Sequence, residues 1–469
     1  MHCLLNGLVR ELKNLDMGVE IEEGKLINAL LYADDIVLMA ENRYALQHML
    51  NVVANYAKKW RFELNPKKSE VVVFGLKRAP RGINWKLGDN IIKQVTHYKY
   101  LGIELTRTLR WAPYFKRVLA KAKRNMTQAL AMGIRGGFMS MRLAKIIWTS
   151  LVRSIIEYGC EIWGDKDITD FEKLQVQMGK RILRCGSRMS EEVVRGELGW
   201  ERQKARGDEM RLRYWGKIVR MSDDRIVKRI YRESKNRLER EEDEQKHNDD
   251  VVLTKTWCKY TKKLMISLKL EEEWRRECIP GEDEWNAVIR ERIHDREQIK
   301  WRTNCLLKPK LRTYVKLKSK LRAEPYLDVY HRGGIPELVK VRGGTNRLRI
   351  EQGRYIKEAL EERNCIYCNN GEIEDEKHFM LKCEVYVDLR ENMWREFERI
   401  TETKTESLPT EDSQLKALIG EQFQPEVEEA KDSPRSKAYS ELTTVVMKYV
   451  TTAMHRRRQL QRKVPSSPE

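Results

Sequence analysis

The chain alternates between short apolar runs and stretches in which apolar residues recur every three or four positions. The short runs fall between residues 19 and 105 and are bounded by turn residues, which predicts strands. Helical spacing is clear at 4–15 and 43–60, and again from 111 to about 227. We therefore expect an α+β fold in which an antiparallel sheet with packed helices comes first and mainly helical structure follows.

One strand-length apolar run is interrupted by two adjacent carboxylates. It reads Leu30-Leu31-Tyr32-Ala33-Asp34-Asp35-Ile36-Val37-Leu38-Met39-Ala40. An ionised carboxylate among apolar strand residues is costly unless it is solvated, paired or coordinating a cation. The pair is either an acidic turn at a hairpin tip, because Asp is common in turns, or a hairpin that holds Asp34 and Asp35 toward Mg²⁺ for phosphoryl chemistry. The pair alone leaves both readings open.

The charge balance favours a polyanionic partner. Of 469 residues, 91 are Lys or Arg and 71 are Asp or Glu, a net charge of +20. Phosphate neutralisation is the usual outlet for such an excess, and a merely soluble basic protein is the alternative. No stretch approaches the roughly 18 apolar residues of a membrane helix, and the N-terminus has no signal-peptide pattern. We expect a nuclear and cytoplasmic protein that is not secreted and has no membrane partner.

Four residues near the C-terminus have the spacing of metal ligands: Cys365-x₂-Cys368, His378 and Cys383. Three thiolates and one imidazole are the soft tetrahedral set that structural Zn²⁺ prefers. Binding would be tied to folding of this small, core-poor region. Coincidental thiols are the alternative. The other cysteines form no even secreted framework, so we expect them to be mostly buried thiols.

The acidic hairpin and the residues after it resemble the non-LTR (LINE-type) retrotransposon reverse transcriptases. Tyr32-Ala33-Asp34-Asp35 is similar to their YxDD box, and the following motifs occur in the family's order. They are Trp60, Leu64-Asn65-Pro66-x-Lys68-Ser69-Glu70, Tyr98-Lys99-Tyr100-Leu101-Gly102, Ile156-Glu157-Tyr158-Gly159-x₃-Trp163, Leu198-Gly199-Trp200, Lys310-Leu311-Arg312-Thr313-Tyr314 and Glu372-Ile373-Glu374-Asp375-Glu376-x-His378-Phe379. The resemblance covers most of residues 1 to about 400.

The resemblance implies an RNA-directed DNA polymerase. Asp34 and Asp35 would hold Mg²⁺, or Mn²⁺, for transfer of dNTPs onto a DNA primer or target along an RNA template. Lys68 matches a candidate proton donor to the pyrophosphate leaving group, and a solvated surface lysine is the alternative. Tyr100-Leu101-Gly102 resembles the primer grip, where a glycine within a strand lets another backbone approach closely; an ordinary bulge is equally open.

Basic residues cluster on the helix expected near residues 114–132. Lys116, Lys121 and Arg124, with Arg117 and Lys123, would face the phosphates of a bound duplex if the resemblance holds. A solvated charged face is the alternative.

Resemblance and charge pattern together divide the chain into five parts. We expect a partial palm at 1–106, a helical thumb-like region at 107–228, a charged helical connector at 229–300, a C-terminal region with the Cys₃His zinc module at 301–400, and a loose acidic segment with a basic tail at 401–469. The sequence from Arg229 to Asp250 is almost wholly charged, so we expect an exposed helix without a core that fades into a linker. The tail residues His455–Arg458 would bind nucleic acid, serve nuclear import or simply be solvated.

The sequence contains no match to the family's upstream strand that carries another metal-binding Asp. Two ions held close together need carboxylates from two places, and Asp34 with Asp35 supply one side. We therefore expect the C-terminal portion of such a polymerase, inactive alone. The alternative is a non-enzymatic nucleic-acid-binding remnant that uses its basic helices and its zinc module.

Overall fold

The structure is a computed structural model that describes residues 2–75, 82–134, 140–247, 254–329, 333–368, 370–422, 424 and 433–463. The chain forms two compact units. The first comprises residues 1–118, 159–165 and 210–287, and the second comprises 119–158, 166–209 and 288–469. None of the helices in the described ranges is both long enough and apolar enough to cross a membrane.

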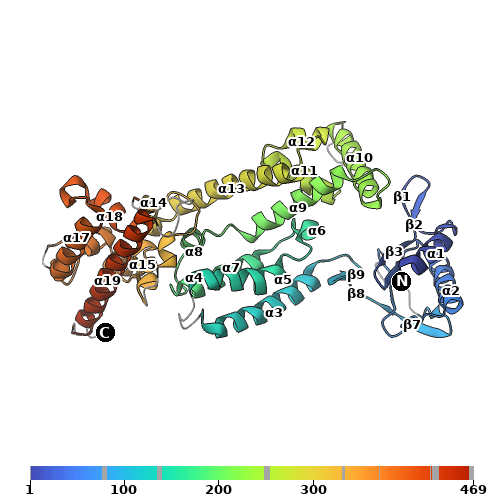
Figure 1. Ribbon diagram of the computed structural model, residues 1–469, viewed down its shortest axis with the longest axis horizontal. Coiled ribbons are helices and arrows are strands. Elements are labelled where there is room, and N and C mark those ends of the chain that lie inside the picture. The colour runs from blue at the N-terminus through green and yellow to red at the C-terminus, as the bar shows by residue number, and fades with distance from the viewer. Residues whose placement is uncertain are drawn as a thin grey trace. The chain divides into compact units, whose positions relative to one another are not determined.

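The first unit begins with short sheets that pack against two helices, α1 (His2–Lys13) and α2 (Arg43–Trp60) (Figure 1). The strands are β1 (Val19–Glu22), β2 (Lys25–Ile27), β3 (Ala29–Tyr32), β4 (Asp35–Leu38), β5 (Glu70–Val72), β6 (Trp85–Leu87), β7 (Asn90–Val95), β8 (His97–Tyr100) and β9 (Ile103–Thr106). They pair as the hairpins β1–β2, β3–β4 and β8–β9 and as a sheet in the order β5-β7-β6, in which β5 and β7 are parallel. The expected α+β class is confirmed, with several short sheets in place of one.

Helix α2 supports the acidic hairpin. The Asn42 side chain accepts hydrogen bonds from the N–H groups of Tyr44 and Ala45, each at 3.0 Å, so the helix begins at Arg43 as predicted. Its apolar face is buried against α1 and against the β3–β4 hairpin. This core contains Leu8, Leu12, Met49, Val53 and Tyr56, with Leu31 and Ile36 of the hairpin packed at its edge. Each fully buried side chain of this kind contributes roughly 1.5–3 kcal/mol.

The remainder of the first unit is helical. It contains α6 (Cys160–Trp163), most of α9 (Gln203–Arg220), α10 (Ile226–His247), α11 (Trp257–Ser267), α12 (Glu271–Arg276) and the start of α13 (Glu282–Leu306). An aromatic core holds these helices together, with the rings of Trp215 and Trp274 stacked 6.0 Å apart and Tyr231 edge-on to Trp274 at 6.2 Å.

The expectation that residues 229–250 bury no core is wrong for the part of that stretch which the structure describes. Tyr231 and Leu238 of α10 are only 3 % and 2 % exposed. A helix needs just one apolar stripe to pack, and residues seven positions apart share a face. The Tyr231 hydroxyl also accepts from the Trp215 indole N–H at 3.0 Å and donates to Glu277 at 2.7 Å. Residues 248–250, where the helix was expected to fade, lie outside the described ranges.

The second unit is also mainly helical. Its α-helices include the start of α9, most of α13 and the end of α3 (Ala112–Ala129). The others are α4 (Met141–Ile147), α5 (Ser154–Ile156), α7 (Thr169–Leu183), α8 (Glu191–Leu198), α14 (Tyr314–Leu317), α15 (Gly334–Arg342), α16 (Arg349–Tyr355), α17 (Val387–Thr401), α18 (Glu411–Ile419) and α19 (Pro434–Lys463). π-Helical turns occupy Leu130–Ile134, Trp148–Arg153 and His378–Lys382, and 3-10 turns occupy Pro309–Leu311, Pro325–Asp328, Leu360–Glu362, Glu384–Tyr386 and Thr405–Ser407. Helix α19 packs against both α15 and α17 (Figure 1).

Part of the expected basic tail has a structural role. Helix α19 buries Val446 and Val450 at 1 % and 0 % exposure. Arg457, on the same helix, is buried and donates two hydrogen bonds to the Glu374 carboxylate, at 2.9 and 2.7 Å. Arg456 likewise donates two hydrogen bonds to the Asp388 carboxylate, at 2.6 and 2.7 Å. A helix with an apolar stripe carries its arginines into the packed interface, so the tail is not simply solvated.

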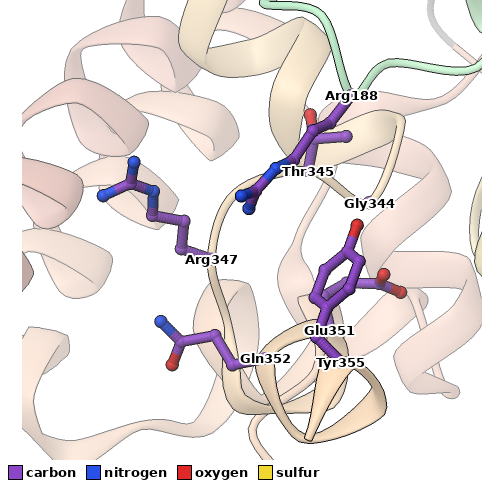
Figure 2. A pocket seen from close by; sticks show the side chains of 7 residues that line it. All are labelled: Arg188, Gly344, Thr345, Arg347, Glu351, Gln352 and Tyr355. Atoms are coloured by element: carbon purple, nitrogen blue, oxygen red, sulfur yellow. The ribbon is translucent and has the colours of Figure 1, made fainter.

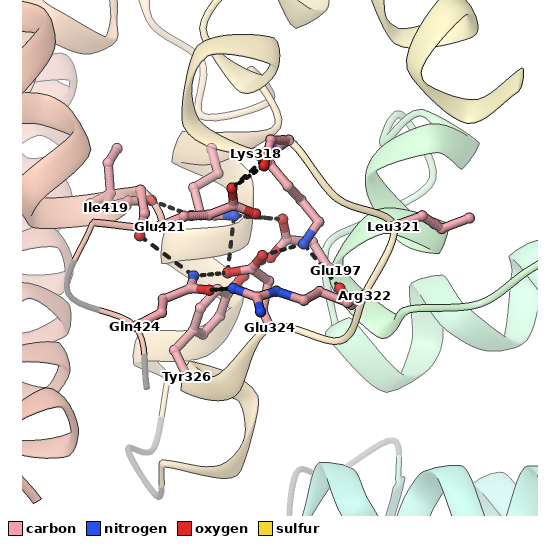
Figure 3. Close-up of polar contacts among 12 residues, drawn as sticks. Glu197, Lys318, Leu321, Arg322, Glu324, Tyr326, Ile419, Glu421 and Gln424 are labelled. Atoms are coloured by element: carbon pink, nitrogen blue, oxygen red, sulfur yellow. Dashed lines mark hydrogen bonds and ion pairs between the residues drawn. The ribbon is translucent and has the colours of Figure 1, made fainter. Parts of the chain in front are cut away.

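A charge network that we call the buried quartet joins α8, the segment after α14 and α15. Its members are Glu197, Lys318, Glu324 and Arg342, whose side chains are at most 1 % exposed. Arg342 lies 3.1 Å from Glu197 and 3.2 Å from Glu324. Lys318 pairs with Glu324 (Figure 3). Two positive and two negative charges cancel, which is the condition under which such groups can be buried.

Candidate functional site

The two carboxylates expected to bind metal lie at the tip of the β3–β4 hairpin. Tyr32 pairs with Asp35, so Ala33 and Asp34 form a two-residue turn. Ala33 has a φ of +54°, in the left-handed region that the tight hairpin turns use. Asp34 and Asp35 are both exposed. They are therefore in contact with solvent and open to a cation.

Asp35 lies near the next hairpin, β8–β9. Burial, and after it the negative charge of Asp35, raises the pKa of Tyr98 and of Tyr100. The Tyr98 hydroxyl donates a hydrogen bond to the backbone carbonyl of Lys68 at 3.4 Å. The fold thus gathers three segments that the sequence had selected separately: the acidic hairpin, the Lys68 turn and the Tyr100 strand.

The Lys68 turn is built by Asn65. The Asn65 side-chain oxygen accepts from the backbone N–H groups of Lys67 and Lys68 at 3.1 and 3.2 Å. The Asn65 carbonyl accepts from the N–H and the hydroxyl of Ser69 at 3.1 and 2.9 Å. Lys68 is exposed and forms no ion pair with any residue in the described ranges. Its backbone is fixed, and its ammonium group keeps an uncompensated charge.

The glycine of the segment that resembles a primer grip is not in a strand, contrary to expectation. Leu101 and Gly102 form the two-residue turn between β8 and β9, with φ values of +45° and +84°. A two-residue hairpin with both central φ values positive explains the glycine. Arg117 of α3 holds this turn through a hydrogen bond to the Gly102 carbonyl at 3.0 Å and an ion pair with Glu104 at 3.2 Å.

The other basic residues selected on α3 point outward. Lys116, Lys121 and Arg124 are exposed, whereas Val118 and Ala122 on the opposite side are buried. This arrangement suits a solvated face and a phosphate-binding face equally.

The four C-terminal candidate ligands are brought together. All of their ligand atoms lie within 4.8 Å of one another. The sulfur atoms of Cys365 and Cys383 are 4.0 Å apart, and the Cys368 sulfur is 3.4 Å from Nε2 of His378. Tetrahedral sites with metal–sulfur distances near ~2.3 Å and metal–nitrogen distances near ~2.0 Å have edges of about this length. The cluster can therefore hold one metal ion.

Residues outside the predicted ligand set orient these ligands. Nδ1 of His378 lies 3.2 Å from the Glu372 carboxylate, and the His378 backbone N–H donates to Asp375 at 2.8 Å. Arg390 donates to the Cys383 carbonyl at 2.9 Å. The position of Glu372, a carboxylate six residues before the candidate ligand His378, was the sequence signal that could have predicted this role.

The electrostatics of the cluster favour a ligand in its ionised form. The hydrogen bond between the two sulfur atoms lowers the pKa of the Cys365 thiol, against the opposing effect of burial, and raises the pKa of the Cys383 thiol. The hydrogen bond with His378 lowers the pKa of Glu372, so this carboxylate stays charged beside the imidazole. Phe379, which is fully buried, packs edge-on against Tyr386 at 5.2 Å and forms the floor of the region.

The two candidate metal positions differ in completeness. Across the described ranges, the residues that come together as three or more possible ligands are the four of the Cys₃His cluster. Asp34 and Asp35 supply two adjacent carboxylates, which fits a divalent ion held from one side. Glu70, which also raises the pKa of Tyr98, adds negative charge to that neighbourhood.

Known proteins are similar to the part of the chain that contains the acidic hairpin. Residues 2–105 match the family model described as reverse transcriptase (RNA-dependent DNA polymerase). The probable RNA-directed DNA polymerase from transposon BS of Drosophila melanogaster is 30% identical over 158 residues, which are 32% of this chain and 17% of that protein. The RNA-directed DNA polymerase from mobile element jockey of the same organism is 22% identical over 171 residues, which are 35% of this chain and 18% of that protein.

A third relative is the probable RNA-directed DNA polymerase from transposon X-element of Drosophila melanogaster, which is 23% identical over 164 residues, or 33% of this chain and 18% of that protein. The chain spans less than a fifth of the length of the curated relatives it matches. Partial coverage agrees with the expectation of a portion of a longer polymerase. The tandem carboxylates at the hairpin tip lie inside the matched residues, so the part of the chain that carries them is similar to the reverse transcriptases of transposons.

Proposed function

We propose that this chain is part of a retrotransposon RNA-directed DNA polymerase in which Asp34 and Asp35 bind Mg²⁺, with Mn²⁺ as a substitute. The observation that carries the proposal is the exposed carboxylate pair at a two-residue hairpin tip, with Asp35 near the β8–β9 hairpin. When bound, such an ion stabilises the charge that develops on a transferring phosphoryl group. The carboxylates themselves fix the ion and define where a dNTP and a primer end meet.

The neighbouring segments have roles that follow from their positions. Lys68, on a turn locked by Asn65, would donate a proton to the pyrophosphate leaving group or neutralise its charge. The Leu101–Gly102 turn, held by Arg117, would seat the DNA primer. The exposed Lys116, Lys121 and Arg124 would contact the phosphates of an RNA template paired with that primer.

The chain by itself is proposed to bind metal and nucleic acid without extending a primer. Two ions require carboxylates from two places, and Asp34 and Asp35 form only a pair within the residues that the structure describes. The second candidate function, non-enzymatic nucleic-acid binding, is favoured by the exposed basic face of α3 and the assembled Cys₃His cluster.

A paired measurement tests the carboxylate assignment. Mn²⁺ binding is followed by electron paramagnetic resonance in the unmodified chain, in Asp34→Asn/Asp35→Asn and in Asp89→Asn. Asp89 is a matched control, because it is an exposed aspartate at the β6–β7 turn. We expect the double variant to lose a bound Mn²⁺ that Asp89→Asn retains. Equal binding by all three proteins would remove the basis of the assignment.

Primer extension then separates the two functions. The purified chain is given an RNA template, a DNA primer and labelled dNTPs with Mg²⁺. We expect retention of the template–primer without incorporation. Incorporation that disappears in Asp34→Asn would show that the chain is an active polymerase, and would refute the proposed inactivity while supporting the carboxylates.

We further propose that the Cys₃His cluster holds structural Zn²⁺. The donor set of three thiolates and one imidazole and the 3.4 and 4.0 Å separations support this ion. Metal analysis should find one zinc per chain, lost in Cys365→Ser and kept in Cys278→Ser, whose cysteine is exposed and lies outside the cluster. A zinc content that is unchanged in Cys365→Ser would contradict the proposal.

A further inference from the structure

A basic groove lies in the second unit, where two cavities of about 270 and 520 Å³ adjoin. They share Arg188, Thr345 and Arg347 as lining residues. The groove is formed by the loop before α8, by α15, α16 and the loop between them, and by the C-terminal turns of α19. Its positively charged lining residues are Arg188, Lys340, Arg347, Arg457 and Arg458.

The acidic residues of the groove are already neutralised. Glu351 is paired with Arg312 and Arg354, each at 3.1 Å. Glu337 is paired with Lys340 at 3.1 Å and with Arg458 at 3.4 Å. The described residues provide no ion-pair partner for Arg188 or Arg347, and both are exposed. The groove therefore has a net positive charge centred on these two arginines.

An exposed aromatic ring lies at the edge of this charge. Tyr355 is 56% exposed, and the guanidinium carbon of Arg188 is 5.3 Å from its ring centroid. Figure 2 shows Arg188, Arg347 and Gln352 around one open space, with the Tyr355 ring at its side. An arginine stacked on a tyrosine presents a planar cationic surface, which is the type of surface that unpaired bases stack on.

The loop that carries Arg347 is held in an unfavourable backbone conformation. Arg347 has a φ of +61°, a region that costs a non-glycine residue about 1 kcal/mol or more. The hydroxyl of Thr345 and the amide nitrogen of Asn346 have no hydrogen-bond partner among the described residues, although both residues line the groove. Strain and unpaired donors in one loop are typical of a segment shaped for a ligand.

We propose that this basic groove binds a single-stranded nucleic acid, with Arg188 and Arg347 on its phosphates and a base on the Arg188–Tyr355 stack. The proposal rests on the proposed function and deepens it, because it assigns the nucleic acid a second contact outside residues 2–105. A paired base has its faces covered by its neighbours in the duplex, so an exposed stacking surface favours an unpaired strand.

The test uses the full chain in magnesium-free buffer, so that it does not depend on Asp34 or Asp35. Fluorescence anisotropy follows the binding of labelled 12-nucleotide oligouridylate, 12-nucleotide oligothymidylate and a 12-base-pair DNA duplex. The variants are Arg188→Ala/Arg347→Ala and Tyr355→Ala. The control is Arg395→Ala, which removes an exposed arginine of α17 outside the groove. Circular dichroism and metal content confirm that each variant folds.

We expect the double arginine variant to bind either single strand about tenfold or more weakly and to lose about two charges from the salt dependence. Tyr355→Ala should weaken single-strand binding at least fivefold with an unchanged salt dependence, because stacking is not ionic. Arg395→Ala should change the affinity less than twofold. Tighter binding of the RNA strand or of the DNA strand identifies which of the two the groove takes, and equal binding identifies recognition through phosphates and bases alone.

Three results would overturn the proposal. In the first, the double arginine variant binds the single strands as tightly as Arg395→Ala does. In the second, the duplex binds as tightly as the single strands, and its affinity falls as much in the variants. In the third, polyglutamate displaces the strands as well as unlabelled RNA does. The last result would identify a surface for acidic peptides. Asp34→Asn/Asp35→Asn should bind the single strands normally, so a failure of the groove and a failure of the carboxylate site give different patterns.

Discussion

Arg202 and Glu297, 95 positions apart in the chain, form a bidentate ion pair in which Nε and Nη2 of Arg202 donate to the two carboxylate oxygens at 2.7 and 2.6 Å. Glu297 is 2% exposed, and Arg296 lies 3.4 Å from it. Burial by itself would raise the pKa of Glu297, but the hydrogen bond and charge of Arg202 and the charge of Arg296 outweigh it and lower the pKa. The pair joins α13 to the residue just before α9.

This pair predicts a pH-dependent stability. Because the pKa of Glu297 is lower in the folded than in the unfolded chain, its contribution is present above about pH 4.5 and is lost as the pH falls through the folded value. Glu297→Gln should cost about 3 kcal/mol at pH 7, since it leaves Arg202 without its partner. Urea unfolding at pH 7 and at successively lower pH measures the difference. Glu291→Gln, an exposed position on the same helix, should cost nothing measurable at either pH.

The buried quartet predicts a charge-balance effect. Arg342→Met should destabilise the fold by about 3–5 kcal/mol, because Glu197 and Glu324 then share one cation, Lys318. Adding Glu197→Gln restores one charge of each sign and should recover part of the loss. A double-mutant cycle by urea unfolding measures the coupling. Additive costs would show that Arg342 stabilises through packing on Tyr314 and Tyr326 instead of through charge.

A side chain at position 199 should clash with neighbouring backbone at the end of α8. The φ of Gly199 is +64°, and a Cβ at this position would collide with the backbone of Arg322 and Ala323. Gly199→Ala should therefore cost at least ~2 kcal/mol, from the left-handed conformation and the clash together. Gly186→Ala is the matched control, because its φ is +82° and its Cβ would meet no atom. Thermal unfolding should show the control losing only about 1 kcal/mol. Equal losses would mean that Ala323 moves aside freely.

Replacing Glu372 should change the metal affinity although all four ligands remain. Glu372→Gln keeps the size of the side chain but removes the charge 3.2 Å from Nδ1 of His378. The affinity for zinc should fall about 10- to 100-fold, as for other carboxylates that orient a ligating histidine. Competition with a coloured chelator measures the affinity. Glu411→Gln, on the other side of Lys382, should leave it unchanged.

Much of the candidate site could be read from local sequence. The apolar runs on both sides of Asp34 and Asp35 indicated a hairpin with an acidic tip, because this pattern depends on residues a few positions apart. The spacing of Cys365, Cys368, His378 and Cys383 specified a ligand set for the same reason.

Other features depend on partners that are distant in the sequence. Gly102 was expected within a strand, but the pairing of β8 with β9 places it in a turn. The charged stretch around Tyr231 gave no sign of a core until Trp215 and Trp274 were packed against it. Arg457 was read as part of a basic tail, and only the contact with Glu374 shows that it is buried.

The sequence by itself determined the periodic elements, the acidic hairpin and the Cys₃His ligand set, because turn residues, short apolar runs and ligand spacing act over a few residues. The tertiary structure alone decided which charges are buried in pairs, which remain in the basic groove and which carboxylate orients His378. These outcomes depend on desolvation and on contacts between segments that can be more than a hundred positions apart, and no local pattern encodes them.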